Sequence, residues 1–114
     1  MSRSSRRRPE PLHPEAQAID ILDVLHALAD PTRMTIVQAL QVDSELACGT
    51  FPVDVAPSTL THHFRVLRDA GVIRQRDDGQ RRWTALRRDD LDLRFPGLLG
   101  NIVDAYTRQR DQSS

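Results

Sequence analysis

The chain has 114 residues, a length typical of one domain with a modest hydrophobic core. Its 16 basic residues are all arginine and are matched by 16 acidic residues, so the formal net charge is zero. The single cysteine, Cys48, excludes an internal disulfide and favours a reducing, cytoplasmic compartment. We expect neither a signal peptide nor a membrane span, because the apolar stretches are only a few residues long.

The charge is distributed unevenly along the chain. Residues 58–88 hold eight arginines and three acidic residues, whereas residues 11–57 hold one arginine and seven acidic residues. A neutral protein can still bind a polyanion through one basic region, because the local field governs the encounter. The second half of the chain is therefore the candidate for contact with nucleic acid.

Residues 1–14 combine serine, arginine and three prolines, a composition that predicts a disordered tail. The run Arg6-Arg7-Arg8 in this tail suits a phosphate backbone or a minor groove, although a solvated tail explains it at least as well. We expect the folded domain over residues 15–110 and a second disordered stretch over residues 111–114.

The first predicted helix covers residues 16–28. Its apolar residues recur at helical spacing and form a stripe wider than one side of a small domain needs. Part of this stripe is therefore expected to face a partner chain.

A second helix is predicted to begin at Asp30-Pro31, with the aspartate as N-cap and the proline as first helical residue. It should end at about Gln41. Residues 43–55 contain a glycine and a proline, so at most a short helix around Leu46 is expected there.

The most informative stretch is Pro57 to Gly71, P-S-T-L-T-H-H-F-R-V-L-R-D-A-G. Leu60, Phe64 and Leu67 share one face of the predicted helix, and Gly71 stands where a left-handed residue ends it. The other face and its flanks are polar, with Ser58, Thr59, Thr61, His62, Arg65 and Asp69. Hydroxyl, imidazole and guanidinium groups of this kind suit the major groove of DNA, although a solvated amphipathic helix is the simpler alternative.

Two strand-like runs, Val72–Arg76 and Arg81–Leu86, flank an Asp-Gly pair and predict a β-hairpin. The hairpin carries four arginines and follows the polar helix directly. This order is that of a winged helix-turn-helix, in which a basic wing enters the narrow minor groove. A solvated hairpin with charges that protect its edge would explain the arginines but not their position.

An amphipathic pattern over residues 91–106, broken at Pro96-Gly97, predicts C-terminal helices. Together with the first helix they favour a symmetric homodimer, whose two recognition helices would contact a palindromic site. The expected fold class is thus mainly α with a small β-hairpin, a winged helix-turn-helix that dimerises through its N- and C-terminal helices.

The segment A-L-A-D-P-T-R at residues 27–33, the run 58–71 and the following wing resemble the ArsR/SmtB family of bacterial transcriptional regulators. The resemblance covers roughly residues 18–106 and implies a homodimeric repressor that leaves its operator when a ligand binds. It places four helix residues in the major groove, while His63, close to the apolar stripe, is expected to be packed or phosphate-facing. The candidate DNA-binding residues are Ser58, Thr59, Thr61, His62, Arg65, Arg76, Gln80, Arg81 and Arg82.

The sequence departs from this family in three ways. The segment before the recognition helix has one thiol where metal-sensing relatives carry several, and no histidine follows His63, so neither a metal nor another cofactor is expected. An effector, if one exists, is an unidentified small molecule. The first helix of the helix-turn-helix should be truncated, since Pro52 lies in a shortened spacing and Ala56 is a weak N-cap.

Two alternatives to a DNA-binding regulator remain open from the sequence. A winged helix can serve as a protein-interaction module, because the fold alone does not fix function. Cys48 could make the protein redox-responsive, although a lone cysteine is more often a small buried hydrophobic residue. An enzyme is not expected, since the sequence has no phosphate-binding glycine loop, nucleophile elbow or metal-ligand set.

Overall fold

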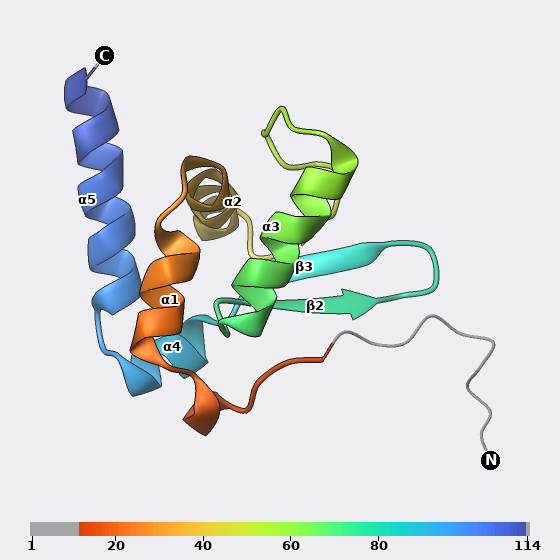
Figure 1. Ribbon diagram of the computed structural model, residues 1–114, viewed down its shortest axis with the longest axis horizontal. Coiled ribbons are helices and arrows are strands. Elements are labelled where there is room, and N and C mark those ends of the chain that lie inside the picture. Colours follow the sequence, from red (N-terminus) through yellow and green to blue (C-terminus); the bar gives the residue numbers. More distant parts are fainter. Residues whose placement is uncertain (1–11, 114) are drawn as a thin grey trace.

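The computed structural model of the protein describes residues 12–113 (Figure 1). Helices dominate, and the strands form one antiparallel sheet in the order β1-β3-β2. This confirms the predicted class, mainly α with a β-hairpin, and adds a third strand. In chain order the elements are η2 (a 3-10 helix, Ala16–Ala18), α1 (Ile21–Leu28), α2 (Pro31–Val42), β1 (Leu46–Ala47), α3 (Pro57–Asp69), β2 (Ile73–Asp77), β3 (Arg82–Leu86), α4 (Arg88–Arg94) and α5 (Leu98–Ser113).

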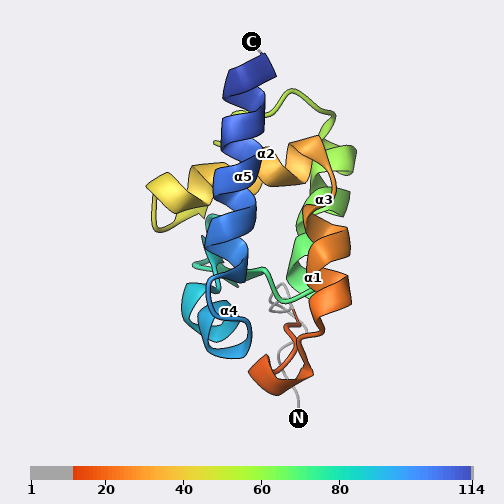
Figure 2. The same ribbon diagram turned by 90° about the vertical axis from the view of Figure 1, so that its left-hand side faces the viewer.

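The core lies where α1, α2 and α3 pack together against the sheet. Val24 from α1, Ile36 and Leu40 from α2, Leu67 from α3 and Ile73 from β2 are fully buried. These residues sit on the apolar stripes of their helices and on the inward face of the strand, as amphipathic elements require. The views in Figures 1 and 2 place α5 on the side of the molecule opposite the β2–β3 hairpin.

The predicted first helix over residues 16–28 is wrong in one respect, because the chain is not helical at Ile19 and Asp20. The Asp20 side chain accepts a hydrogen bond from the Leu22 amide at 2.7 Å and so acts as the N-cap of α1. Ile19 is buried just before this cap, and its carbonyl accepts a hydrogen bond from Arg94 Nη2 at 2.6 Å. The Asp20 cap and the hydrogen bond from Arg94, which is distant in the sequence, thus separate η2 from α1.

The segment around Leu46 is also corrected, since it forms a strand rather than a short helix. Leu46 and Ala47 pair with Thr84 and Trp83 of β3, so a sheet edge decides the local structure. From Cys48 to Ala56 the chain forms no helix at all, which goes beyond the truncation expected from the sequence.

The predicted start of α2, the end of α3 and the break at Pro96-Gly97 are confirmed. Asp30 Oδ2 accepts a hydrogen bond from the Arg33 amide at 3.0 Å, with Pro31 at the first helical position. Ala56 provides no side-chain cap for α3, and Gly71 has a φ of +86° just after its end. Pro96 and Gly97 separate α4 from α5.

Both ends of the described chain extend past the predicted domain bounds of 15 and 110. His13 accepts a hydrogen bond from the Gln75 amide at 3.0 Å, and the Pro14 carbonyl accepts one from Arg87 at 2.8 Å. At the other end α5 continues to Ser113. The remainder of the predicted tail, with its arginine run at residues 6–8, lies outside the described residues.

Within residues 12–113, none of the helices has both the length and the apolar character that crossing a bilayer requires.

Candidate nucleic-acid interface

Helix α3 has one buried face and one exposed polar face. Phe64 and Leu67 are buried against the core, and Leu60 is half-buried at its edge. The opposite side exposes every α3 residue predicted to meet DNA: Ser58, Thr59, Thr61, His62 and Arg65. The exposed side therefore offers short hydroxyls, an imidazole and a cation to an approaching partner.

Arg65 is the most available cation on this helix. Its side chain makes no hydrogen bond or ion pair with any other residue that the structure describes, in contrast to most arginines of the domain. Thr61, one turn earlier, donates its hydroxyl proton back to the Pro57 carbonyl at 3.0 Å and still keeps acceptor capacity. The helix thus presents a free guanidinium beside a pre-oriented hydroxyl.

His63 faces inward and links α3 to the other helices. Its Nδ1 lies 3.1 Å from Nη1 of Arg33, whose side chain is buried at 8% residue exposure. The same guanidinium donates to the carbonyl of Ala27 at 2.6 Å and of His26 at 3.4 Å. Because an arginine can only donate, Nδ1 of His63 is the acceptor and the ring proton resides on Nε2. One buried arginine of α2 therefore joins the C-terminal end of α1 to α3.

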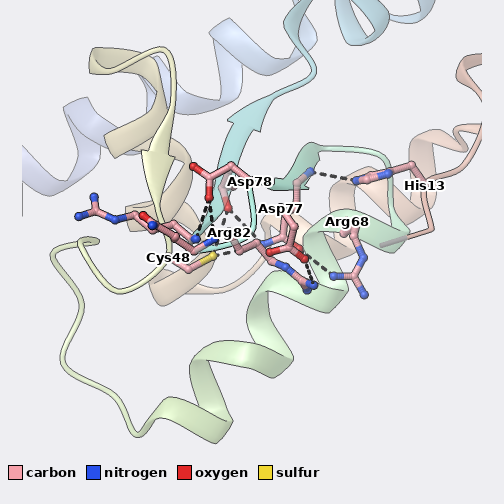
Figure 3. A network of polar contacts seen from close by, with 10 residues as sticks. His13, Cys48, Arg68, Asp77, Asp78 and Arg82 are labelled. Atoms are coloured by element: carbon pink, nitrogen blue, oxygen red, sulfur yellow. Dashed lines mark hydrogen bonds and ion pairs between the residues drawn. The ribbon is translucent and has the colours of Figure 1, made fainter. Parts of the chain in front are cut away.

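A second polar contact joins α3 to the wing through Gln75 (Figure 3). Arg68 Nη1 donates to Gln75 Oε1 at 2.7 Å, and Gln75 Nε2 donates to Thr84 Oγ1 at 3.1 Å. The Cys48 sulfur lies 3.5 Å from Gln75 Nε2 and 3.4 Å from Thr84 Oγ1. This role of Gln75 was not predicted from the sequence. A glutamine at an inward position of an alternating strand, next to Ile73, is the signal that could have revealed it.

The tip of the wing is fixed by Asp78. Its Oδ1 accepts hydrogen bonds from the amides of Gln80 and Arg81 at 3.0 and 2.8 Å, and its Oδ2 accepts one from the Trp83 indole at 2.9 Å. These bonds, the one from Trp83 foremost, lower the pKa of Asp78 from 3.8 to about 2. The loop consequently holds Gln80 and Arg81 exposed at the end of the hairpin.

The other two wing candidates have acidic partners. Arg76 makes two hydrogen bonds of 2.9 Å to Glu45, which raise the pKa of Arg76, and its guanidinium lies 5.7 Å from the centre of the Trp83 ring. Arg82 pairs with Asp77 at 2.9 Å, and its side chain is only 24% exposed. Arg82 lies on the inward face because it is two residues from buried Thr84, so strand alternation turns it away from the outer surface of the wing.

The carboxylate of Asp78 gives the wing a predictable acid response. Its pKa is lower in the folded protein, so its stabilising effect is complete above about pH 4 and is lost as the pH falls towards 2. We expect the difference in unfolding free energy between the native protein and Asp78→Asn to shrink from pH 5 to pH 2. Urea unfolding, followed by the fluorescence of the single tryptophan, measures this difference.

Asp43→Asn is the matched control for this experiment, because Asp43 is exposed and its side chain bonds to no other described residue. The same unfolding measurements on Asp43→Asn give the effect of replacing an exposed carboxylate by an amide elsewhere in the fold. If the difference in unfolding free energy shrinks equally for Asp78→Asn and Asp43→Asn, the hydrogen bonds of Asp78 do not stabilise the loop.

An apolar surface lies between α1 and α5, where Figure 2 shows the two helices on the face turned towards the viewer. Ile21, at the start of α1, is exposed there, and Leu22 and Leu25 of the same helix are exposed as well, Leu22 at 69%. Beside them runs a shallow groove lined by Ile21, Phe95, Pro96, Leu98, Asn101, Ile102 and Ala105. Exposed aliphatic residues next to an apolar groove are typical of a surface that another chain covers.

Cys48 lies in the polar layer beneath the wing rather than on this apolar surface. Its neighbours are Gln75 and Thr84, and the side chain is half-buried. Over the described part of the chain, histidine, cysteine, aspartate and glutamate side chains nowhere gather in threes that could hold a metal ion.

Comparison with known proteins places these features in context. A family model described as a helix-turn-helix domain matches residues 28–76, from the end of α1 into β2. The uncharacterised HTH-type transcriptional regulator YceK of Bacillus subtilis is 33% identical over 82 residues, which cover 69% of this chain and 82% of that protein. A homolog of the cadmium resistance transcriptional regulatory protein CadC from Staphylococcus aureus is 31% identical over 64 residues, or 54% of this chain and 53% of the relative.

The fold has a counterpart among solved structures. A crystal structure of an ArsR family transcriptional regulator superposes with a TM-score of 0.57 at 21% identity, over 89% of this chain and 94% of the other. At this level of identity the agreement concerns the fold.

Proposed function

Because this chain belongs to the ArsR-like family of DNA-binding helix-turn-helix transcriptional regulators, we propose that it is a homodimeric repressor of a palindromic operator. The family is one of regulators and not of enzymes. The observation that carries the proposal is the exposed polar face of α3, with an Arg65 side chain that pairs with no other described residue, opposite an apolar face packed on the core. Such a helix can enter a major groove without disturbing the core that supports it.

In this proposal α3 supplies the base contacts and the wing supplies phosphate or minor-groove contacts. Ser58, Thr59, Thr61 and His62 meet base edges, and Arg65 meets a phosphate or a guanine. At the wing, Gln80 and Arg81 make the main contacts, because the hydrogen bonds from their amides to Asp78 already hold both residues at the exposed tip. Arg76 contacts a phosphate that replaces Glu45 as its ion-pair partner. Arg82 stabilises the wing through its ion pair with Asp77.

The apolar surface between α1 and α5 is proposed as the dimer interface. It would bury the exposed side chains of α1 and fill the adjacent groove with a second copy. A symmetric dimer carries two recognition helices, and a palindromic site matches that symmetry. The protein would act in the cytoplasm, with an unidentified small molecule as its effector.

The structure offers little support for the alternative of a thiol switch. An intersubunit disulfide needs the two Cys48 residues close together, whereas Cys48 sits beneath the wing and not on the α1–α5 surface. The interaction-module hypothesis predicts no salt-dependent affinity for any duplex, and the experiment below separates it from DNA binding.

Substitution of the α3 face tests the proposal. Arg65→Ala and His62→Ala should each weaken binding to the operator about 5- to 150-fold, because each removes one groove contact worth about 1–3 kcal/mol. Fluorescence anisotropy with the DNA upstream of the gene, across a salt series, measures the affinity. Both side chains are exposed, so urea unfolding should be unchanged.

Arg108→Ala is the control for lost charge, since Arg108 is exposed on α5, where it pairs with Asp104 at 3.1 Å. It should bind as the native protein does. Native affinity in both α3 variants would refute the assigned interface. If the native protein binds no duplex at micromolar concentration and low salt, the interaction module becomes the better hypothesis.

A further inference from the structure

The outer face of the wing carries a cluster of charged and aromatic side chains. Residues along β2 alternate between buried and exposed, so Arg76 faces solvent while its neighbour Gln75 faces the core. Arg76 lies directly opposite Trp83 of β3 in the antiparallel pair. Both residues belong to the hairpin that projects from the helices (Figure 1), so this face is open to a partner.

Arg76 is paired with an acidic residue from the far side of the sheet. Glu45 directly precedes β1, and the strand order β1-β3-β2 places β3 between the two partners. Two hydrogen bonds of 2.9 Å join Nε and Nη2 of Arg76 to the two carboxylate oxygens of Glu45. A guanidinium group binds two oxygens of a phosphate in the same bidentate way. The Glu45 carboxylate thus fills the position that a phosphate would take on Arg76.

The pair is accessible and lies over an aromatic ring. The side chains of Arg76 and Glu45 are 52% and 34% exposed. The guanidinium groups of Arg76 and Arg81 lie 5.7 and 5.9 Å from the centre of the Trp83 ring, within the range of a cation–π contact. Arg81 approaches this ring without an ion pair to any residue that the structure describes. Of the two cations on one indole, only Arg76 therefore meets an internal anion.

The ion pair of Arg76 differs from its neighbour on the hairpin. Arg82 and Asp77 also pair at 2.9 Å, but both side chains are more buried than those of Arg76 and Glu45. A duplex that approaches the outer face of the wing can therefore reach Arg76 and not Arg82.

The Glu45 carboxylate is an anion that DNA can displace. An ion pair at the surface contributes little, because solvent and salt screen both charges. A duplex brings a continuous row of phosphates, and the counterions that it releases favour the exchange. The internal pair should thus weaken the binding of DNA without preventing it.

We propose that Glu45 is an internal competitor of DNA, whose carboxylate occupies the phosphate-binding side of Arg76 and lowers the affinity of the wing for a duplex. The inference rests on the proposed function and deepens it, since it names the residue that limits the contribution of the wing. A DNA strand that docks on Arg81 must displace Glu45 before Arg76 can bind a phosphate. Because phosphate contacts carry no base information, the competition affects the operator and unrelated duplexes alike.

Glu45→Gln tests the competition, because it removes the charge and keeps the length of the side chain. The affinities for the operator and for a scrambled duplex should both rise about two- to fivefold, a factor that corresponds to the loss of one exposed ion pair. Fluorescence anisotropy across a salt series measures both affinities. A damaged fold would weaken binding, so a gain in affinity distinguishes competition from a structural role.

The double variant shows whether the gain depends on Arg76. Arg76→Ala alone should weaken binding and make the slope of log affinity against log salt shallower by about 0.9, the effect of one lost phosphate contact. In this background Glu45→Gln should raise the affinity no more than Asp43→Asn does in the native protein. Asp43 is the matched control, because it is exposed, lies two residues before Glu45 and bonds to no other described residue.

The outcomes separate the competition from the proposed function itself. An unchanged or reduced affinity in Glu45→Gln, or an equal gain with and without Arg76, would overturn the competition and leave the regulator standing. Failure of the native protein to bind any duplex would overturn the proposed function instead.

Discussion

Replacing Gly71 by alanine should lower the free energy of unfolding by about 2–5 kcal/mol, combining a left-handed backbone with an overpacked contact. Gly71 has a φ of +86°, and a Cβ there would lie 2.5 Å from Cγ1 and 2.8 Å from Cδ1 of Ile19. Ile19 cannot easily retreat, because its side chain is 1% exposed and its carbonyl is bonded to Arg94. Urea unfolding at one fixed protein concentration measures the loss, which avoids a contribution from dimerisation.

Gly79→Ala separates the two causes. Gly79 has a φ of +95°, but a Cβ there would meet nothing within 4 Å. This variant should lose only the backbone cost of about 1–2 kcal/mol. Equal losses of unfolding free energy in Gly71→Ala and Gly79→Ala would mean that the Ile19 side chain moves aside without cost. The close packing between the end of α3 and the N-terminal segment would then contribute nothing to stability.

Arg33→Met should lower the free energy of unfolding by about 2–4 kcal/mol, because it removes the donors and leaves their acceptors buried. The Ala27 carbonyl and Nδ1 of His63 would lose bonds of 2.6 and 3.1 Å, while methionine keeps much of the side-chain volume. Urea unfolding under the conditions used for Gly71 measures the change.

Arg65→Met is the matched substitution on the exposed face and should change stability by no more than about 0.5 kcal/mol. A double-mutant cycle of Arg33→Met with His63→Leu should give a coupling energy of about 0.5–3 kcal/mol, because the two side chains share a bond. Strictly additive losses would show that the contact between α2 and the recognition helix carries no stability.

The elements predicted correctly from the sequence are those whose ends are set by residues at the boundary itself. Asp30-Pro31 starts α2 through its own cap, Gly71 ends α3 in the left-handed conformation, and Asp78-Gly79 closes the hairpin. The two wrong elements depend on distant partners. Leu46 becomes a strand because β3 offers a free edge, and the chain leaves the helix at Ile19 next to Arg94.

The candidate site was likewise predictable where a local sequence pattern defines it and not where its residues depend on distant partners. Spacing alone separates the polar face of α3 from its apolar stripe, and the structure exposes every α3 candidate. The partners of the wing arginines were not predictable, because Glu45 lies 31 residues from Arg76 in the sequence. Strand alternation would have indicated the inward position of Arg82, had it been applied next to Thr84.

The loop at residues 48–56, which stands where the first helix of the motif was expected, is held by few side chains. Cys48 contacts Gln75 and Thr84 at its start, and Phe51 is buried and meets Phe64 of α3 edge to face, with ring centres 5.3 Å apart. Gly49, Thr50, Pro52 and Asp54 are exposed. A loop with few anchors makes few demands on its other residues or on its length. During the divergence of related chains, substitutions, insertions and deletions should accumulate on either side of this phenylalanine, and the orientation of the recognition helix would survive them.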